Sequence, residues 1–526
     1  MKGNYKLMKK NCKKLLSIML SAILVLTLIP FSVFAYDNKC DCEYVPMIYV
    51  YGRQTTYDDP SSPDRRDLQE ITDEQLSEFV KGALPSLSKA LVTNNYDEYC
   101  DYLINGFIGL LGEFSCDKEG NIKDGSGIDY GWSAENPDTL GDWHKGDNVY
   151  QYVFCYDARL DPFEVADDLK VFIDTVKKVT GHDTINVISR CMGSEYALAY
   201  FVKYGWDDVE TFVQNCSSAN GTTIMSEIFA GKIELDDDAI DRFIAEDNVE
   251  YEETTRVTVA LLNQMKALGL ATETVNKIID KIKAKVVPGA LLGTYGTCPG
   301  YWSMVSKEDY RDAMNLIFGG REEEYSVLIE KLENYDKLVR SRTSEILTQM
   351  HNDGVKLCNI VKYGYQLQPF TASHDTQSDD KISVYHQSYG ATGSDYGKTF
   401  SKLYLYKAKR NGTAKYISPD NTIDASTCLF PETTWFMKDI RHNNFPGCVN
   451  QLYIAACRSE KELTINDDAR FPQYLRHYYW EDSLVPLTEE NAQLHSYTNN
   501  FFTALKNFLK VIIPLIKEKL KSIIQK

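Results

Sequence analysis

The sequence predicts an α/β fold: a mostly parallel sheet with helices on both faces and a helical cap insertion. Three observations support this prediction. Short apolar runs alternate with helix-periodic segments in the first half of the chain, a long acid-rich helical segment follows, and strand patterns then return. Strands that alternate with helices form parallel sheets, because each helix brings the chain back to the end of the sheet at which the previous strand began.

The first half of the chain contains four strand patterns and two helix patterns. Runs rich in Val, Ile, Tyr and Phe predict strands, since such side chains fit a pleated, buried surface. Apolar residues at helical spacing predict the helices. The predicted strands are 45–52, 149–156, 185–188 and 210–215, and the predicted helices are 162–180 and 195–204.

Residues 223 to about 350 are helical in pattern and show no convincing strand. One apolar helix face is formed by Val275, Ile278, Ile279, Ile282 and Val286. Strand character returns at 355–363, and 434–437 is predicted to be the last strand. A helical insertion of this size between sheet strands indicates a cap, and we expect 223–306 to cover the nucleophile described below.

The composition restricts the classes of function. Apolar residues make up 43% and charged residues 25% of the chain, which is typical of a soluble globular protein. The net charge is −18, and residues 1–35 hold six lysines and no acid, so their removal would leave −24. An acidic surface repels phosphate backbones, so we expect no nucleic-acid partner.

Residues 1–35 have the pattern of a secretory signal peptide. Lysines precede an apolar run from 15 to 31, and Val33-Phe34-Ala35 offers acceptable residues at a cleavage site. The alternative is an uncleaved anchor helix. We therefore expect a secreted, extracellular protein, with association with the cell envelope left open. Twelve cysteines follow this segment, but their spacing is not that of a metal site, and no metal or cofactor is predicted.

The tail at 501–526 is predicted to be an amphipathic basic helix interrupted at Pro514. It could lie on an anionic membrane surface, but packing on the acidic core of the same chain is the favoured interpretation. The expected organisation is a signal peptide (1–35), the first half of the core (36–222), the cap (223–353), the second half of the core (354–485) and the C-terminal helix (486–526).

A nucleophile motif follows the strand predicted at 185–188. Residues 189–193, Ser-Arg-Cys-Met-Gly, have the form small-x-nucleophile-x-Gly and lie between a strand and a helix. A nucleophile on so sharp a turn needs small residues two positions before and after it. The following helix N-terminus can present backbone N–H groups to an oxyanion. The spacing predicts Cys191 as a nucleophile, and the alternative is a buried or disulfide-bonded cysteine.

This turn resembles that of the α/β-hydrolases, with Cys191 where serine is usual. Further segments resemble the lecithin:cholesterol acyltransferase family. Residues 156–162, Tyr-Asp-Ala-Arg-Leu-Asp-Pro, are similar to its Tyr-Asp-Trp-Arg-Leu-x-Pro segment, and residues 46–52 are similar to its Pro-Val-x-x-Val-Pro-Gly opening. Residues 299–304 are similar to the segment that ends the family's lid.

The resemblance covers residues 45–222 well and 299–445 loosely. It implies a fatty-acyl ester substrate, lipase or acyltransferase chemistry, and an oxyanion hole formed by the backbone N–H groups of Arg53 and Met192. The chain departs from the family at Cys191, at Tyr51 where a small residue or proline is usual, and at Arg190 where histidine is usual.

The family order implies that an acid and then a histidine follow the nucleophile. Of eight histidines, His442 lies just beyond the strand at 434–437 and is the predicted base, whereas His477 and His495 are expected in polar, peripheral segments. Two carboxylates compete for the acid. Asp420 is favoured because 420–423 resembles the family's Asp-Gly-x-Val turn and Asp420 precedes His442 by 22 residues. Asp379 is the alternative, since 378–382 resembles the same turn and follows the strand at 355–363 more closely, and a structural Asx-turn role remains for both.

Three functions follow from these patterns. The leading hypothesis is an esterase, lipase or O-acyltransferase that acts on a small-molecule or lipid acyl ester through Cys191, His442 and Asp420. The second is a catalytically degenerate α/β-hydrolase fold that binds a ligand beneath its cap. The third is a peptidase or amidase on the same fold.

Overall fold

The computed structural model describes residues 45–492, apart from 124, 134, 137–150, 246–259, 262–263 and 265–268. The signal peptide predicted at 1–35 and the helix predicted at 501–526 lie outside the described residues. Among the helices within that range, none is both long enough and apolar enough to cross a membrane.

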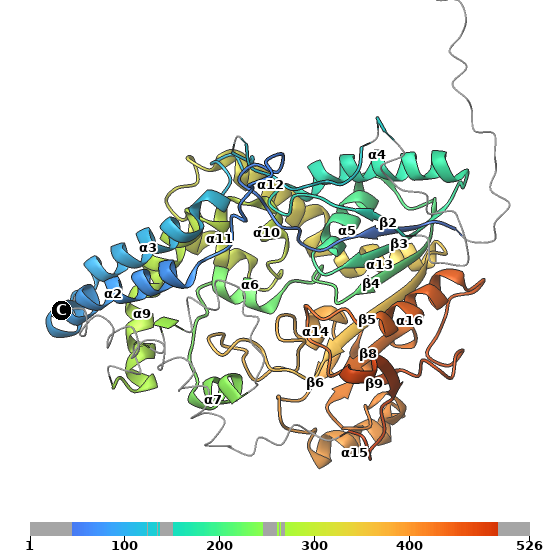
Figure 1. Ribbon diagram of the computed structural model, residues 1–526. Coiled ribbons are helices and arrows are strands. Elements are labelled where there is room, and N and C mark those ends of the chain that lie inside the picture. Colours follow the sequence, from blue (N-terminus) through green and yellow to red (C-terminus); the bar gives the residue numbers. More distant parts are fainter. Residues whose placement is uncertain are drawn as a thin grey trace, which may run out of the picture.

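The core is one eight-stranded sheet in the order β10-β9-β8-β5-β4-β3-β1-β2 (Figure 1). Every neighbouring pair is parallel except β9 and β10. The strands are β1 (Met47–Val50), β2 (Gln151–Phe154), β3 (Ile185–Arg190), β4 (Val209–Asn215), β5 (Lys356–Tyr363), β8 (Thr434–Lys438), β9 (Tyr474–Tyr478) and β10 (Ser483–Pro486). The predicted mostly parallel α/β sheet is therefore confirmed.

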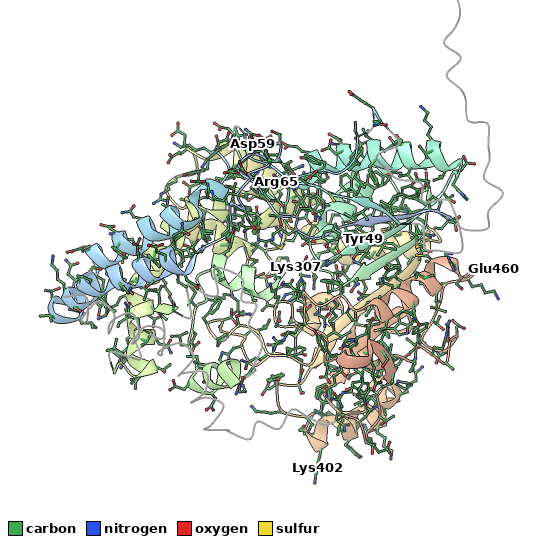
Figure 2. The ribbon with its side chains drawn as sticks, viewed as in Figure 1. Tyr49, Asp59, Arg65, Lys307, Lys402 and Glu460 are labelled. Atoms are coloured by element: carbon green, nitrogen blue, oxygen red, sulfur yellow. The ribbon has the colours of Figure 1, made fainter. Side chains whose placement is uncertain are left out.

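Both faces of this sheet are covered by helices (Figure 1). On one face, Ile48 and Val187 pack in the same cluster as α4 (Pro162–Thr180) and α5 (Gly193–Tyr204). On the other face, Met47 and Ile188 share a cluster with α16 (Gly447–Arg458). Side chains fill these layers, with Tyr49 of β1 at the sheet and Lys402 and Glu460 at the periphery (Figure 2). This is the predicted arrangement of a mostly parallel sheet with helices on both faces.

The strand order reverses at β1. The chain runs from β1 outward to β2, returns to β3 on the other side of β1, and then extends the sheet in that second direction. In α/β sheets, ligands bind beyond the carboxyl ends of the strands at such a reversal. The ends of β1 and β3 are therefore where the topology favours a functional site.

The described residues of the predicted cap form helices. They are α6 (Thr223–Phe229), α7 (Asp237–Ala245), α9 (Thr272–Leu292), α10 (Pro299–Ser303), α11 (Tyr310–Phe318), α12 (Ser326–Leu338) and α13 (Thr343–Asn352). Val275, Ile278 and Ile282 of α9 are buried, as the apolar face predicted. The role of this insertion as a cap over the nucleophile stays a prediction.

A second helical insertion, between β1 and β2, was not predicted. It comprises α2 (Asp73–Thr93) and α3 (Asp97–Leu111), which lie beside α9 in Figure 1. Phe79 and Leu103 belong to the same buried cluster as Val275 and Ile278. The helical layer is thus assembled from two insertions that are far apart in the sequence.

The strand predicted as the last one is not the last. After β8 the sheet continues with β9 and antiparallel β10. The same strands correct the expectation that His477 is peripheral, because β9 lies between β8 and β10 and His477 is buried on it. The elements α14 (Val384–Gln387), α15 (Lys402–Asn411), β6 (Thr392–Gly393) and β7 (Ile423–Asp424) lie between β5 and β8.

Segments 156–162 and 299–304 pack against each other. The Gly300 N–H donates to the Arg159 carbonyl at 3.2 Å, and a Cβ at Gly300 would lie 2.2 Å from the Ala158 carbonyl oxygen, so only glycine fits. The Arg159 guanidinium pairs with Asp157 at 2.7 Å, and neither side chain is exposed. This ion pair therefore lies where the core meets the insertion.

We expect Arg159→Met to lower the free energy of unfolding by about 3–5 kcal/mol, because it leaves the Asp157 carboxylate buried without its counter-charge. The matched control is Arg311→Met, which breaks an ion pair with Glu333 whose arginine is 64% exposed. Urea unfolding followed by tryptophan fluorescence measures both variants. Equal midpoints for the two would contradict this prediction.

Candidate active site

Cys191 lies on the turn between β3 and α5 with a φ of 49°. This left-handed conformation is strained for a non-glycine residue and is typical of functional turns. Gly193 is required here, since a Cβ would lie 2.4 Å from the Val50 carbonyl oxygen. The Ser189 and Ser194 hydroxyls bond each other at 2.9 Å in the interior. The small residues thus let β1 approach the turn closely.

Cys191 and His442 are in contact. The His442 Nε2 lies 3.1 Å from the Cys191 Sγ, and the His442 Nδ1 lies 2.7 Å from Oδ2 of Asp379. His442 follows β8, and its backbone N–H also donates to the Asp379 carbonyl at 2.7 Å. The structure therefore brings together Cys191, His442 and the alternative acid, Asp379.

Asp379 is held by the turn that it forms. Its Oδ1 accepts the backbone N–H groups of Lys381 at 3.1 Å and Ile382 at 2.8 Å, and its side chain is fully buried. The other oxygen is left to face His442. A carboxylate fixed in this way orients the imidazole ring and stabilises its protonated form.

The favoured acid, Asp420, pairs with Lys438 and makes no hydrogen bond or ion pair with His442 among the described residues. Its Oδ2 pairs with the Lys438 Nζ at 2.7 Å, and its Oδ1 accepts the hydroxyls of Ser418 at 2.5 Å and Thr422 at 2.7 Å. The buried Lys438 ammonium needs a counter-charge, and Asp420 supplies it. Asp420 is thus part of a closed structural network.

The contact between Cys191 and His442 favours an ion pair. Burial opposes ionisation of the thiol, but the charge and hydrogen bond of His442 outweigh it and hold the pKa of Cys191 below its ordinary value. Burial also opposes protonation of the ring, but the charges of Asp379 and Cys191 raise the pKa of His442 well above its ordinary value. Both shifts favour the thiolate–imidazolium pair over the neutral thiol and imidazole.

We expect iodoacetamide to alkylate Cys191 at a lower pH than a free cysteine, whose pKa is about 8.5, because the lowered pKa of Cys191 favours the thiolate. The rate should fall only as the pH drops through the lowered pKa of Cys191. In His442→Ala the profile should move to higher pH, since the stabilising charge is gone. Mass spectrometry of the labelled peptide over a pH series measures this, and identical profiles would contradict the ion pair.

The loop that carries His442 is held by a buried lysine that sequence reasoning missed. The Lys362 Nζ donates to the carbonyls of His442 at 3.3 Å and Asn444 at 2.9 Å. Burial lowers the pKa of Lys362. A single lysine within an apolar strand pattern gives no signal of such a role, because its carbonyl partners depend on the tertiary fold.

The two residues expected in the oxyanion hole lie on segments that border Cys191. The Met192 N–H is among the groups that lower the pKa of Cys191 through a hydrogen bond, after burial and His442. A Cβ at Gly52 would lie 3.8 Å from the Cys191 Cβ, so the residue after Gly52, Arg53, is also near the turn. The Arg53 guanidinium donates to Gln69.

Glu195 is a second acid beside Cys191 that was not predicted. Its carboxyl group is fully buried, and the Ser218 Oγ lies 3.0 Å from the Glu195 Oε2 and 3.9 Å from the Cys191 Sγ. Burial, followed by the charge on Cys191, raises the pKa of Glu195 well above its usual range. Its position four residues after Cys191, one turn into α5, was the signal available in the sequence.

We expect Glu195→Gln to become more stable than the parent as the pH rises. A raised carboxyl pKa contributes stability that is complete below the unfolded-state value of about 4.3 and is lost as the pH rises towards the folded-state pKa. An amide cannot ionise and keeps that stability. Thermal unfolding between about pH 5 and pH 8 measures the difference, with the exposed Glu330→Gln as baseline. A difference independent of pH would contradict it.

Cys216 completes the surroundings of His442. It is buried at the end of β4 with a φ of 47°. Its sulfur, a carboxylate oxygen of Asp379 and a ring nitrogen of His442 lie within 4.8 Å of one another. Asp379 and His442 also belong to the contact chain from Cys191, so we interpret this group as part of the candidate active site.

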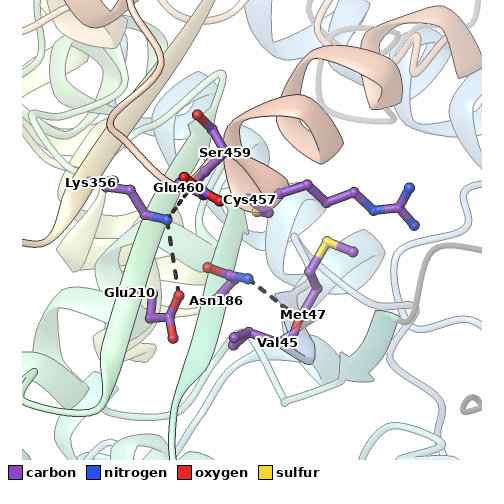
Figure 3. A pocket seen from close by; sticks show the side chains of 9 residues that line it. Val45, Met47, Asn186, Glu210, Lys356, Cys457, Ser459 and Glu460 are labelled. Carbon is purple, nitrogen blue, oxygen red and sulfur yellow. Dashed lines mark hydrogen bonds and ion pairs between the residues drawn. The ribbon is translucent and has the colours of Figure 1, made fainter. Parts of the chain in front are cut away.

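A cavity of about 180 Å³ lies at the opposite end of the sheet (Figure 3). It is lined by Asn186, Glu210 and Lys356, which stand at or near the amino ends of β3, β4 and β5. Lys356 donates to the Ser459 carbonyl at 2.8 Å. Because α/β proteins bind ligands beyond the carboxyl ends of their strands, this cavity is not the candidate active site.

No protein-family model matches the chain, and no curated protein matches it. The chain is similar to the solved structure titled "The crystal structure of Tle4-Tli4 complex", with 12% sequence identity over 60% of this chain and 75% of that chain. The TM-score is 0.24, so this likeness carries no argument about function.

Proposed function

We propose that the protein is a secreted acyl-ester hydrolase or acyltransferase that uses Cys191 as nucleophile, His442 as acid and base, and Asp379 to orient His442. The observation that supports this most strongly is the continuous chain of contacts at the strand-order reversal: 3.1 Å from the Cys191 Sγ to the His442 Nε2 and 2.7 Å from the His442 Nδ1 to Asp379. Nucleophile, base and orienting group stand in the order that covalent acyl transfer requires.

The reaction has two halves. The Cys191 thiolate attacks the ester carbonyl, and the oxyanion that forms accepts hydrogen bonds from the N–H groups of Met192 and Arg53. As the C–O bond breaks, protonated His442 gives its proton to the leaving alkoxide, leaving an acyl-thioester on Cys191. Water or an alcohol then gives a proton to His442 and attacks the thioester, and the thiolate is released.

The proposed substrate class is a fatty-acyl ester. This rests on the resemblance of residues 46–52, 156–162 and 299–304 to the lecithin:cholesterol acyltransferase family. The contact between Gly300 and Arg159 joins two of these segments in space, where the insertion meets the core.

The experiment is hydrolysis of p-nitrophenyl esters of increasing acyl length by protein that lacks residues 1–35. We expect turnover that rises with chain length and stops after alkylation of Cys191. An acceptor alcohol added to the assay separates transfer from hydrolysis, because transfer yields a new ester. Protein that is inert towards every ester and unreactive at Cys191 would instead indicate a ligand-binding protein on this fold.

A further inference from the structure

A second cluster of potential ligand atoms lies away from the active site, at the edge of the sheet formed by β9 and β10. A donor atom of each of Cys448, His477 and Asp482 lies within 4.8 Å of the other two. Cys448 is at the start of α16, His477 is on β9, and Asp482 is in the turn before β10. Figure 1 shows these elements together in orange and red.

Strand β9 places His477 on the face of the sheet that packs against α16. Leu475 and His477 are two positions apart on β9, so both face the same side of the sheet, where Leu475 packs in the cluster that contains α16. Cys448 belongs to that cluster. The strand and the helix therefore place a ring nitrogen and a sulfur opposite each other.

His477 has no hydrogen-bond partner among the described residues. Its side chain is only 2% exposed, yet neither ring nitrogen makes a hydrogen bond there. The Nε2 lies 3.6 Å from Oδ1 of Asp482, which is too long for a direct hydrogen bond. Two ligands of a tetrahedral zinc ion, each about 2.0–2.2 Å from the metal, stand about 3.3–3.6 Å apart.

We propose that Cys448, His477 and Asp482 bind a zinc ion, with water as the fourth ligand. The donor set of thiolate, imidazole and carboxylate is the one that Zn²⁺ selects. On binding, the Cys448 thiol releases its proton to solvent and no redox change is needed. The Gly447 N–H donates to Oδ2 of Asp482 at 3.1 Å and fixes the carboxylate while Oδ1 faces the metal.

The zinc ion would join α16 to the edge hairpin of β9 and β10. Since α16 begins shortly after His442, the metal would also anchor the segment that follows the catalytic loop. The three ligands come from separate elements, which explains why cysteine spacing gave no metal prediction. The site is independent of the proposed enzymatic function.

The test is titration of metal-free full-length protein with Co²⁺ and then Zn²⁺. We expect one Co²⁺ per chain, a thiolate-to-cobalt charge-transfer band, and loss of the band when Zn²⁺ displaces cobalt. Cys448→Ser should abolish the band, whereas Cys191→Ala and Cys216→Ala should keep it. The last two controls exclude metal binding at the sulfurs near His442.

Asp482→Asn is the variant least prone to misfold, because its side chain is 54% exposed. It should weaken Co²⁺ binding about tenfold or more, while Asp467→Asn, which changes an exposed carboxylate in the loop after α16, should leave it unchanged. Zn²⁺ should raise the Tm of the parent but not that of His477→Ala. Absence of the charge-transfer band in the parent at saturating Co²⁺, or its survival in Cys448→Ser, would overturn the proposal.

Discussion

Cys191→Ala is expected to reduce the turnover number for p-nitrophenyl esters by at least about a thousandfold, because no other group at the turn can form the acyl intermediate. Residual turnover would come from substrate binding and the oxyanion hole alone. The parent should accumulate an acyl adduct on Cys191 that mass spectrometry detects, and the variant should not.

The control for this prediction is Cys155→Ala. Cys155 is also partly exposed, and it follows β2 rather than β3. Its replacement should leave both turnover and the adduct on Cys191 intact. Full activity in Cys191→Ala would refute the nucleophile assignment, and loss of activity in both variants would point to a general effect on folding.

The second large expected effect distinguishes the role of Asp379 from that of Asp420. Asp379→Asn should lower turnover by about a hundredfold with little change in stability, because His442 loses the group that orients its ring and stabilises its charge. Asp420→Asn should instead lower stability and leave turnover nearly unchanged. It leaves the buried Lys438 without a counter-charge and should lower the free energy of unfolding by about 3–5 kcal/mol, while turnover at low temperature stays near that of the parent.

Turnover and urea unfolding of both variants measure this contrast. Turnover should fall less in Asp379→Asn than in Cys191→Ala. The reason is that the pKa of the Cys191 thiol is lowered, so its ionisation depends less on proton removal by a well-oriented His442. If Asp420→Asn lost turnover and kept its stability, the assignment of the acid would have to be reversed.

The two carboxylates show what sequence reasoning could and could not resolve. Both build a local turn: Asp379 accepts the N–H of Ile382, and Asp420 accepts the hydroxyl of Thr422. Their sequence contexts are therefore alike. What distinguishes them is the partner delivered by β8 and its following loop, His442 for one and Lys438 for the other. That difference depends on tertiary structure, which the local pattern does not encode.

The elements around the nucleophile were predictable because local physics determines them. Helix α4 has Asp161 as N-cap, proline at its first position and glycine in a left-handed C-cap, and its bounds match the predicted 162–180. The turn at Cys191 needs small neighbours, and these are visible in the sequence. By contrast, α2 and α3 were missed, and β9 was missed because charged and polar residues interrupt its alternation.

The two-part origin of the helical layer has a consequence for how the chain folds. Helices α2 and α3 leave the ribosome long before α9, whose apolar face completes their buried cluster. Until then, Phe79 and Leu103 have no α9 side chains to pack against. Contacts between segments so distant in sequence form late and slowly, and exposed apolar helices in the meantime promote aggregation. A fragment that ends after β4 should therefore aggregate or bind chaperones, although it holds the nucleophile turn and four strands of the sheet.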